Sequence, residues 1–220
     1  MQPESVFHAG EKSVQSRLGV LEIEDWAKNV VRPFLPEQHR AFYADQPFLV
    51  AAARDEEGRP WATLLVGDEG FVSSPDPGRL RIAAAPIEGD ALADAWARGT
   101  DVGLLGIELA TRRRNRVNGR LFESDPALVL GVDQSFGNCP QYIQPREWER
   151  IDPGPPQPAL HGKHLSPSQT SWIETSDTLF IASGHRGSGD HAHFGMDASH
   201  RGGAPGFVAV EGNHTLILPD

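Results

Sequence analysis

Short apolar runs separated by turn residues dominate the middle of the chain. Residues 48–53 and 61–66 are two such runs, and the cluster between them contains Gly58 and Pro60. Runs of this length bounded by such residues are typical of β-strands, so the pair predicts a β-hairpin. Further strands are predicted in the same way at 70–72, 80–82, 102–109, 115–121 and 127–132. Six or seven short strands predict a small antiparallel barrel over residues 47–150.

Helical periodicity is limited to short segments. Ile23, Trp26 and Val30 recur at helical spacing and are followed by prolines, so residues 1–46 are predicted to be a helical lead-in. Residues 90–98 have helical propensity and predict one further helix. The fold class expected from these patterns is mainly β with minor α.

Part of the strand pattern is repeated later in the chain. The first strand recurs at a shift of 131 residues, and the third and fourth strands recur at a shift of 136. The difference of five residues falls in the Gly/His loop 184–195, where an insertion costs little. On this alignment Thr63 corresponds to Ser199, and the constant second shift favours a true duplication over chance. The matched segments are 48–52 with 179–183, 70–72 with 206–208, and 80–82 with 216–218.

These boundaries divide the chain into four predicted segments. They are a helical lead-in at 1–46, a barrel domain at 47–150, a proline-rich linker at 151–175 and a partial second barrel at 176–220. The second copy has strands for half a barrel, which leaves unpaired strand edges that are costly to expose. Either the chain is a fragment of a longer protein, or another chain or the first domain covers these edges.

Two sequence motifs carry a resemblance to a known family. Residues 134–144, QSFGNCPQYIQ, form one motif, and residues 197–208, DASHRGGAPGFV, form the other. Together with 7–11 and 112–120, they resemble the flavin-nucleotide-binding proteins related to pyridoxamine 5′-phosphate oxidase. His200 departs from the pattern, because the family has proline there. The resemblance implies a split barrel, an antiparallel Greek-key-like fold that binds flavin mononucleotide (FMN) between two barrels, usually of two subunits. With the exposed edges, it predicts a homodimer.

The second motif offers the groups that a phosphate needs. A hydroxyl, a guanidinium and two unhindered backbone amides lie within five residues, and together they suit a phosphate. The candidate phosphate contacts are Ser199, Arg201, Gly202 and Gly203. The alternative for this segment is a solvated Gly-rich turn. The isoalloxazine ring needs flat cover and a few hydrogen bonds. Its candidate contacts are Asn138, Tyr142 and Gln144.

A dense basic cluster precedes the first motif. Strand alternation places Arg112, Arg114, Arg116 and Arg120 on one face. Arg116 and Arg120, with Asn118 between them, are therefore further candidates for lining the flavin groove. The alternative is a solvated strand edge.

The histidines suggest a different chemistry. His185, His191, His193 and His200 lie within 16 residues, and such a set is able to bind zinc or iron. The same stretch is rich in glycine, so a mobile loop without metal is the alternative, and no metal ligand is assigned. Cys139 lies before a proline in a turn and is interpreted as structural.

Charge and composition exclude several partners. The net charge of −10 disfavours nucleic acid, because neutralising phosphates requires a basic surface. No apolar stretch reaches the roughly 18 residues of a membrane span. The single cysteine excludes an internal disulfide, and the first residues lack the pattern of a secretory signal, so a cytoplasmic protein is predicted.

The leading functional prediction is FMN binding by a pyridoxamine 5′-phosphate oxidase-like protein, with an oxidoreductase role carried by the flavin. No catalytic residue is assigned, because the fold does not fix the reaction. One alternative is a dimerising split-barrel module without flavin. The other is a metal-binding protein of the histidine loop.

Overall fold

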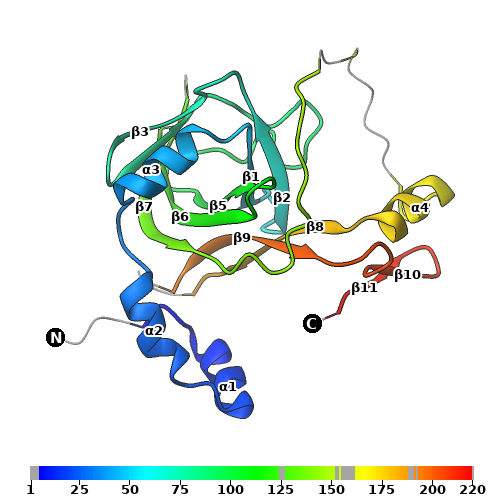
Figure 1. Cartoon of the computed structure of the whole chain (residues 1–220), viewed down its shortest axis with the longest axis horizontal. Coiled ribbons are helices and arrows are strands. Elements are labelled where there is room, and N and C mark those ends of the chain that lie inside the picture. Colours follow the sequence, from blue (N-terminus) through cyan, green and yellow to red (C-terminus); the bar gives the residue numbers. More distant parts are fainter. Residues whose placement is uncertain are drawn as a thin grey trace.

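The computed structural model describes residues 5–123, 127–151, 154, 162–187, 191 and 193–219 (Figure 1). None of the helices in these ranges is both long and apolar enough to cross a membrane. The helices are α1 (Ala9–Leu18), α2 (Ile23–Val30), α3 (Glu37–Ala44) and α4 (Pro167–Thr175). The strands are β1 (Phe48–Arg54), β2 (Pro60–Val66), β3 (Val72–Asp76), β4 (Arg79–Ile82), β5 (Asp101–Glu108), β6 (Arg113–Glu123), β7 (Leu128–Gly137), β8 (Thr178–His185), β9 (Gly195–Gly202), β10 (Ala209–Glu211) and β11 (Thr215–Ile217).

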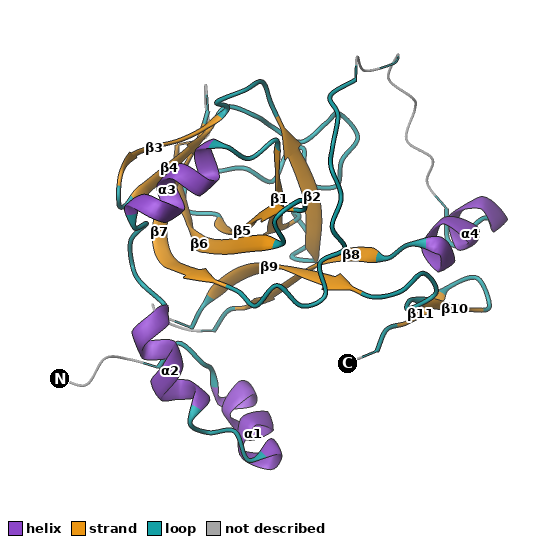
Figure 2. Cartoon of the chain, viewed as in Figure 1, coloured by secondary structure: helices purple, strands orange, loops and turns teal. Residues whose placement is uncertain are grey.

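The first seven strands form one antiparallel sheet in the order β2-β1-β5-β6-β7-β4-β3. Two hairpins, β1–β2 and β3–β4, lie at its ends, and the meander β5–β6–β7 joins them by pairing with β1 and with β4. The sheet curls around a core that includes Leu49, Leu80, Leu104 and Leu130, with Tyr43 added by α3 (Figure 2). The expected mainly β, antiparallel fold class is therefore confirmed. Each strand predicted in this half of the chain has a counterpart, but the one predicted at 70–72 begins only at Val72 and runs to Asp76.

Two predicted segments differ in the structure. Residues 90–98 form successive turns instead of a helix. The Asp90 carboxylate accepts a hydrogen bond from the Thr63 hydroxyl at 2.5 Å and another from the Leu92 amide at 2.8 Å, which fixes the segment locally. A helix this short has little stability of its own, so such anchoring decides its conformation. The second difference is α4, which occupies the end of the predicted linker; residues 152, 153 and 155–161 of that linker lie outside the described residues.

The β8–β9 hairpin packs on the outer face of the seven-stranded sheet. Met196 and Ala198 of β9 form a second apolar core with Val50, Ala52 and Leu105. Figure 1 shows β8 and β9 running along one side of the barrel. The two halves of the chain therefore share an interface built from strand faces, as in sheet-on-sheet packing.

A glycine sets how closely these layers approach. A Cβ atom on Gly103 of β5 would lie 2.5 Å from the Met196 carbonyl oxygen and 2.6 Å from the Asp197 Cα. We expect Gly103→Ala to lower the free energy of unfolding by about 2 kcal/mol, because the backbone has no room to yield. Urea denaturation measures this, with Gly154→Ala as the control, since nothing lies within 4 Å of a Cβ there. Equal stability of the two variants would contradict the close contact.

The order of elements after residue 162 repeats that of residues 37–82. A helix and two hairpins, α3, β1–β2 and β3–β4, are followed later by α4, β8–β9 and β10–β11. Ala51 pairs with Thr63 in the first set, and Ile181 pairs with Ser199 in the second. This register requires a shift of 130 for the first strand, one residue less than the predicted 131, while the shift of 136 holds. The difference matters because a one-residue slip reverses which side chains face the core. The duplication itself stays a prediction. Superposition of residues 61–82 on residues 197–218 would test it.

Candidate functional site

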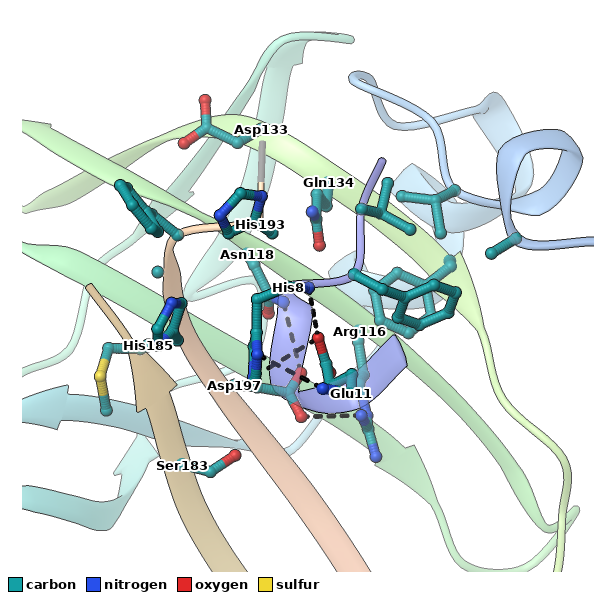
Figure 3. A pocket seen from close by; sticks show the side chains of 18 of the residues that line it. His8, Glu11, Arg116, Asn118, Asp133, Gln134, Ser183, His185, His193 and Asp197 are labelled. Atoms are coloured by element: carbon teal, nitrogen blue, oxygen red, sulfur yellow. Dashed lines mark hydrogen bonds and ion pairs between the residues drawn. The ribbon is translucent and has the colours of Figure 1, made fainter. Parts of the chain in front are cut away.

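A cavity of about 390 Å³ lies where the N-terminal helices meet the two sheets. Its walls come from the start of α1, from α2, from β6 and β7, and from the β8–β9 hairpin. Figure 3 shows side chains of these segments pointing toward one another. The volume falls in the range of small-molecule sites, so this cavity is the candidate binding site.

One carboxylate organises the polar wall of the cavity. Asp197 of β9 accepts a hydrogen bond from the Arg116 guanidinium at 2.7 Å and from the Asn118 amide at 3.3 Å. The Ser199 hydroxyl donates to the same carboxylate at 3.0 Å. Arg116 and Asn118 share a face because residues two apart in β6 point the same way. The carboxylate therefore joins the first sheet to the β8–β9 hairpin.

Three polar atoms in the cavity wall are buried without a hydrogen-bond partner among the residues that the structure describes. They are Nε of Arg116, Oδ1 of Asn118 and Oδ1 of Asn138. Buried polar groups without a partner cost about 1–3 kcal/mol each, so native structures rarely keep them. One unpaired donor and two unpaired acceptors therefore belong to residues that line a single cavity.

The rest of the wall includes four aromatic side chains. Phe7, Trp26, Phe136 and Phe194 line the cavity from four different segments. The guanidinium carbon of Arg116 lies 5.9 Å from the centre of the Phe136 ring. Flat apolar walls with a few polar groups suit a planar, heteroatom-bearing ring.

Histidines gather at one side of the cavity. His8 and His185 have ring centroids 4.2 Å apart, and His193 lies 5.9 Å from His185 and 5.3 Å from His191. His8 also caps α1, because its Nδ1 accepts a hydrogen bond from the Gly10 amide at 3.0 Å. Within the described part of the chain, no three or more His, Cys, Asp or Glu residues are placed to hold a metal ion.

His200 lies apart from that cluster. Its side chain is buried beside Phe180, and a guanidinium nitrogen of Arg114 lies 3.0 Å from its Nδ1. Burial is the main cause that lowers the pKa of His200 to about 4, and the charges of Arg114 and Arg201 lower it further. The imidazole is therefore neutral at pH 7. Its Nε2 is buried and has no hydrogen-bond partner in the described part of the chain.

The nine residues predicted to contact FMN lie at several different sites in the structure. Arg116 and Asn138 line the cavity. Arg120 forms ion pairs with Asp101 at 3.9 Å and Asp133 at 3.5 Å instead of lining it. The expectation that Arg112 shares this face is wrong, because Arg112 lies in the turn before β6 with a left-handed φ of 56°.

Two further predicted ring contacts lie in the segment after β7. The Tyr142 side chain is exposed, and the Gln144 amide donates to the Gly203 carbonyl at 3.2 Å. Both residues line a shallower depression than the cavity at Asp197. The Gln144 hydrogen bond links the segment after β7 to the second motif.

The predicted phosphate motif has mixed roles. Ser199 is buried with its hydroxyl directed at Asp197, and the Gly203 amide donates to the Asp177 carbonyl at 3.1 Å. Gly202 lacks room for a side chain against the Tyr142 carbonyl. Arg201 is the exposed cation of the motif, and the structure gives its guanidinium a hydrogen bond to the His200 carbonyl at 3.2 Å.

The sequence did not indicate that the N-terminal segment lines the cavity. Phe7 precedes α1 and Trp26 lies in α2, whose apolar side chains show amphipathic spacing but not the surface they will cover. In the sequence, Asp197 is only the first residue of the second motif. Its position two residues before Ser199 places both on one strand face, which is the signal that could have linked them.

Removing the organising carboxylate tests the polar wall. We expect Asp197→Ala to lower the free energy of unfolding by about 2 kcal/mol, because Arg116, Asn118 and Ser199 lose one shared acceptor. Asp197→Asn should cost less, since its amide oxygen still accepts. Urea denaturation measures both, with the exposed Asp68→Ala as control. A parent-like midpoint for Asp197→Ala would refute the organising role.

Comparison with known proteins adds little to this geometry. No protein-family model matches the chain. No curated protein sequence matches it either. Among solved structures, HupZ of Group A Streptococcus has a TM-score of 0.37 and 10% identity, covering 51% of this chain and 99% of HupZ. A HupZ variant with one histidine replaced by alanine has the same score and identity, with 47% and 99% covered.

Proposed function

We propose that the chain binds FMN and that the cavity at Asp197 receives the isoalloxazine ring. The observation that carries this proposal is the set of unpartnered buried atoms on Arg116, Asn118 and Asn138 between aromatic walls. A flavin ring is flat, with an apolar edge and a row of nitrogen and oxygen atoms on the other side. Both kinds of wall that such a ring needs are therefore present.

The residues of this chain would bind and orient the ring. Asn118 and Asn138 offer acceptors, Arg116 offers a donor, and Phe136 and Trp26 offer flat cover. A bound flavin supplies hydride or electron transfer, which makes an oxidoreductase the class of enzyme that fits. Arg201 is retained as the proposed phosphate contact, because it is the exposed cation of the second motif.

The resemblance in sequence supports the same cofactor. The motifs at 134–144 and 197–208 lie on β7, β9 and the segments after them, and they contribute Asn138 and Asp197 to the same cavity. Residues far apart in sequence that share a family-like pattern thus meet at one site.

The test is binding of FMN to the purified full chain. Quenching of flavin fluorescence on titration, with a yellow protein after gel filtration, is the expected result. Asn138→Ala should weaken binding about three- to tenfold, because one hydrogen bond contributes roughly 1 kcal/mol. Asn213→Ala, an exposed change in the last hairpin, is the control. If no binding is seen at about 100 μM FMN, the proposal is rejected and a dimerising module without flavin is favoured.

A further inference from the structure

The N-terminal arm, residues 5–30, buries little surface against the rest of the molecule. Helix α1 buries none of its residues, and α2 buries Ala27 alone. Lys12 of α1 lies 3.2 Å from Glu24 of α2, but this ion pair joins the two helices to each other. Segments with so few buried contacts open at a small cost in free energy. A modest change in the contacts of the arm can therefore decide whether it stays docked.

His8 connects the arm to the β8–β9 hairpin. The centre of its ring, just before α1, lies 4.2 Å from the centre of the His185 ring in β8. His185 in turn lies 5.9 Å from His193, which stacks on His191 at 5.3 Å with the ring planes 10° apart. Figure 3 shows His8, His185 and His193 at one side of the cavity. Imidazoles from three segments of the chain thus gather where the arm meets the hairpin.

The hydrogen bonds of His8 require a neutral ring. Its Nδ1 accepts hydrogen bonds from the backbone amides of Gly10 and Glu11 at 3.0 Å and 3.4 Å, so this nitrogen carries no proton. The proton is then on Nε2, which lies 3.6 Å from the Glu11 carboxylate. In this state His8 brings no charge to His185, and the two rings can lie together.

The other charged side chains around the histidines are in ion pairs, apart from Glu11. The pairs are Arg116 of β6 with Asp197 of β9 at 2.7 Å, Asp133 of β7 with Arg120 at 3.5 Å, and Arg186 after β8 with Asp101 at 2.9 Å. Because each pair combines opposite charges, it offers the histidines little net negative charge. Glu11 lies on α1 with His8, so its attraction for a protonated His8 is the same whether the arm is docked or not.

We propose that His8, His185 and His193 form a pH-sensitive latch, which holds the N-terminal arm over the cavity when neutral and releases it when protonated. An imidazole ordinarily gains its proton at about pH 6.5. Protonated rings this close repel one another, and the repulsion between His8 and the other two disappears when the arm leaves. Acid therefore favours the undocked arm, because protons bind more readily to that form.

Release of the arm would open the cavity. Phe7 and Trp26 of the arm form part of its wall, so an undocked arm exposes the site to solvent. A small molecule in the cavity would then be held at neutral pH and released in mild acid. The latch depends on where the arm docks and not on which ligand occupies the cavity, so it is independent of FMN.

Amide hydrogen exchange of the full chain without added FMN tests the latch. Exchange is followed by mass spectrometry at pH values about one unit on either side of 6.5 and is corrected for the intrinsic effect of pH. We expect residues 9–30 to exchange about tenfold faster at the lower pH, which corresponds to about 1.4 kcal/mol of repulsion. Residues 101–108, in β5, should change much less. Equal protection of 9–30 at the two pH values, or an equal loss at 101–108, would overturn the proposal.

A variant of the central histidine assigns the effect to the latch. His185→Phe keeps a flat ring against His8 but cannot gain a proton, so residues 9–30 should stay protected at the lower pH. The variant should fold as the parent does, because this side chain is exposed. If exchange of 9–30 in His185→Phe rises as much as in the parent, acid releases the arm by another route and the proposal is wrong.

A second histidine pair supplies the matched control. His214, an exposed residue of the last hairpin, has its ring 6.3 Å from that of His164 and lies outside the cavity wall. His214→Phe should respond to pH as the parent does, and a loss of the response in this variant would contradict the latch. His200 is present in all three proteins, so its effect on global stability cancels. FMN is absent throughout, so the proposed function stands or falls separately.

Discussion

Replacing Arg201 by alanine is expected to weaken FMN binding ten- to a hundredfold. A guanidinium forms a planar, two-pronged, charge-assisted bond to a phosphate, and such bonds contribute roughly 1.5–3 kcal/mol. Each 1.4 kcal/mol changes the dissociation constant about tenfold. Arg201→Lys should recover part of the loss, because an ammonium keeps the charge but not the two-pronged geometry. Titration followed by flavin fluorescence measures the three constants.

Two controls make this result specific. Arg81→Ala removes an exposed arginine from β4 and should leave binding unchanged. Riboflavin lacks the phosphate, so its affinity should not depend on Arg201. If Arg201→Ala binds FMN as tightly as the parent, the phosphate contact lies elsewhere. The arginines of β6, Arg116 and Arg120, are then the next candidates.

Acidification from pH 7 to pH 4 is expected to lower the free energy of unfolding by about 3 kcal/mol through His200 alone. The folded-state pKa of His200 is lowered from 6.5 to about 4, chiefly by burial and then by Arg114 and Arg201, with Asp177 opposing. Between these two values the unfolded chain binds a proton that the folded chain does not. Stability therefore rises with pH in this window and is lost as pH falls through it. Each unit of difference corresponds to about 1.4 kcal/mol.

The asparagine variant isolates this contribution. His200→Asn keeps an acceptor for Arg114 but does not titrate, so its stability should change less between pH 7 and pH 4 than that of the parent. Urea denaturation at both pH values measures the difference, with the exposed His164→Gln as control. His39, whose pKa is lowered by burial and by Arg32 and Arg113, contributes in the same direction in every variant. An unchanged pH dependence in His200→Asn would refute the assignment.

Local patterns predicted the strands of the first barrel because each strand is set by its own apolar run. The hairpin at β1–β2 and the strand at 102–109 each contain a continuous apolar run, and both were found. The helix at 90–98 was wrong because one side chain, Asp90, binds Thr63 across the fold. The predicted alignment of β1 with β8 was off by one residue, because apolar residues occur on both faces of β8. Packing against Val50 and Ala52 decides which face is inside.

The candidate site was less predictable than the fold. The sequence indicated Arg116 and Asn138, since their motifs resemble a family, and both line the cavity. It did not indicate that Ser199 would be directed at Asp197, because a hydroxyl near a basic motif suits a phosphate equally well. The aromatic walls depend on where α2 packs, and no local pattern encodes that docking.

The position of the N-terminal helices has a consequence for how the cavity behaves in solution. The walls of the cavity come from segments near residues 7, 26, 116 and 196, so the N-terminal helices must be docked for the cavity to exist. Any molecule that occupies it binds the docked form alone, and mass action then favours docking. Protease cleavage between α2 and α3 should therefore slow as the site fills, which makes the N-terminal arm a reporter of occupancy.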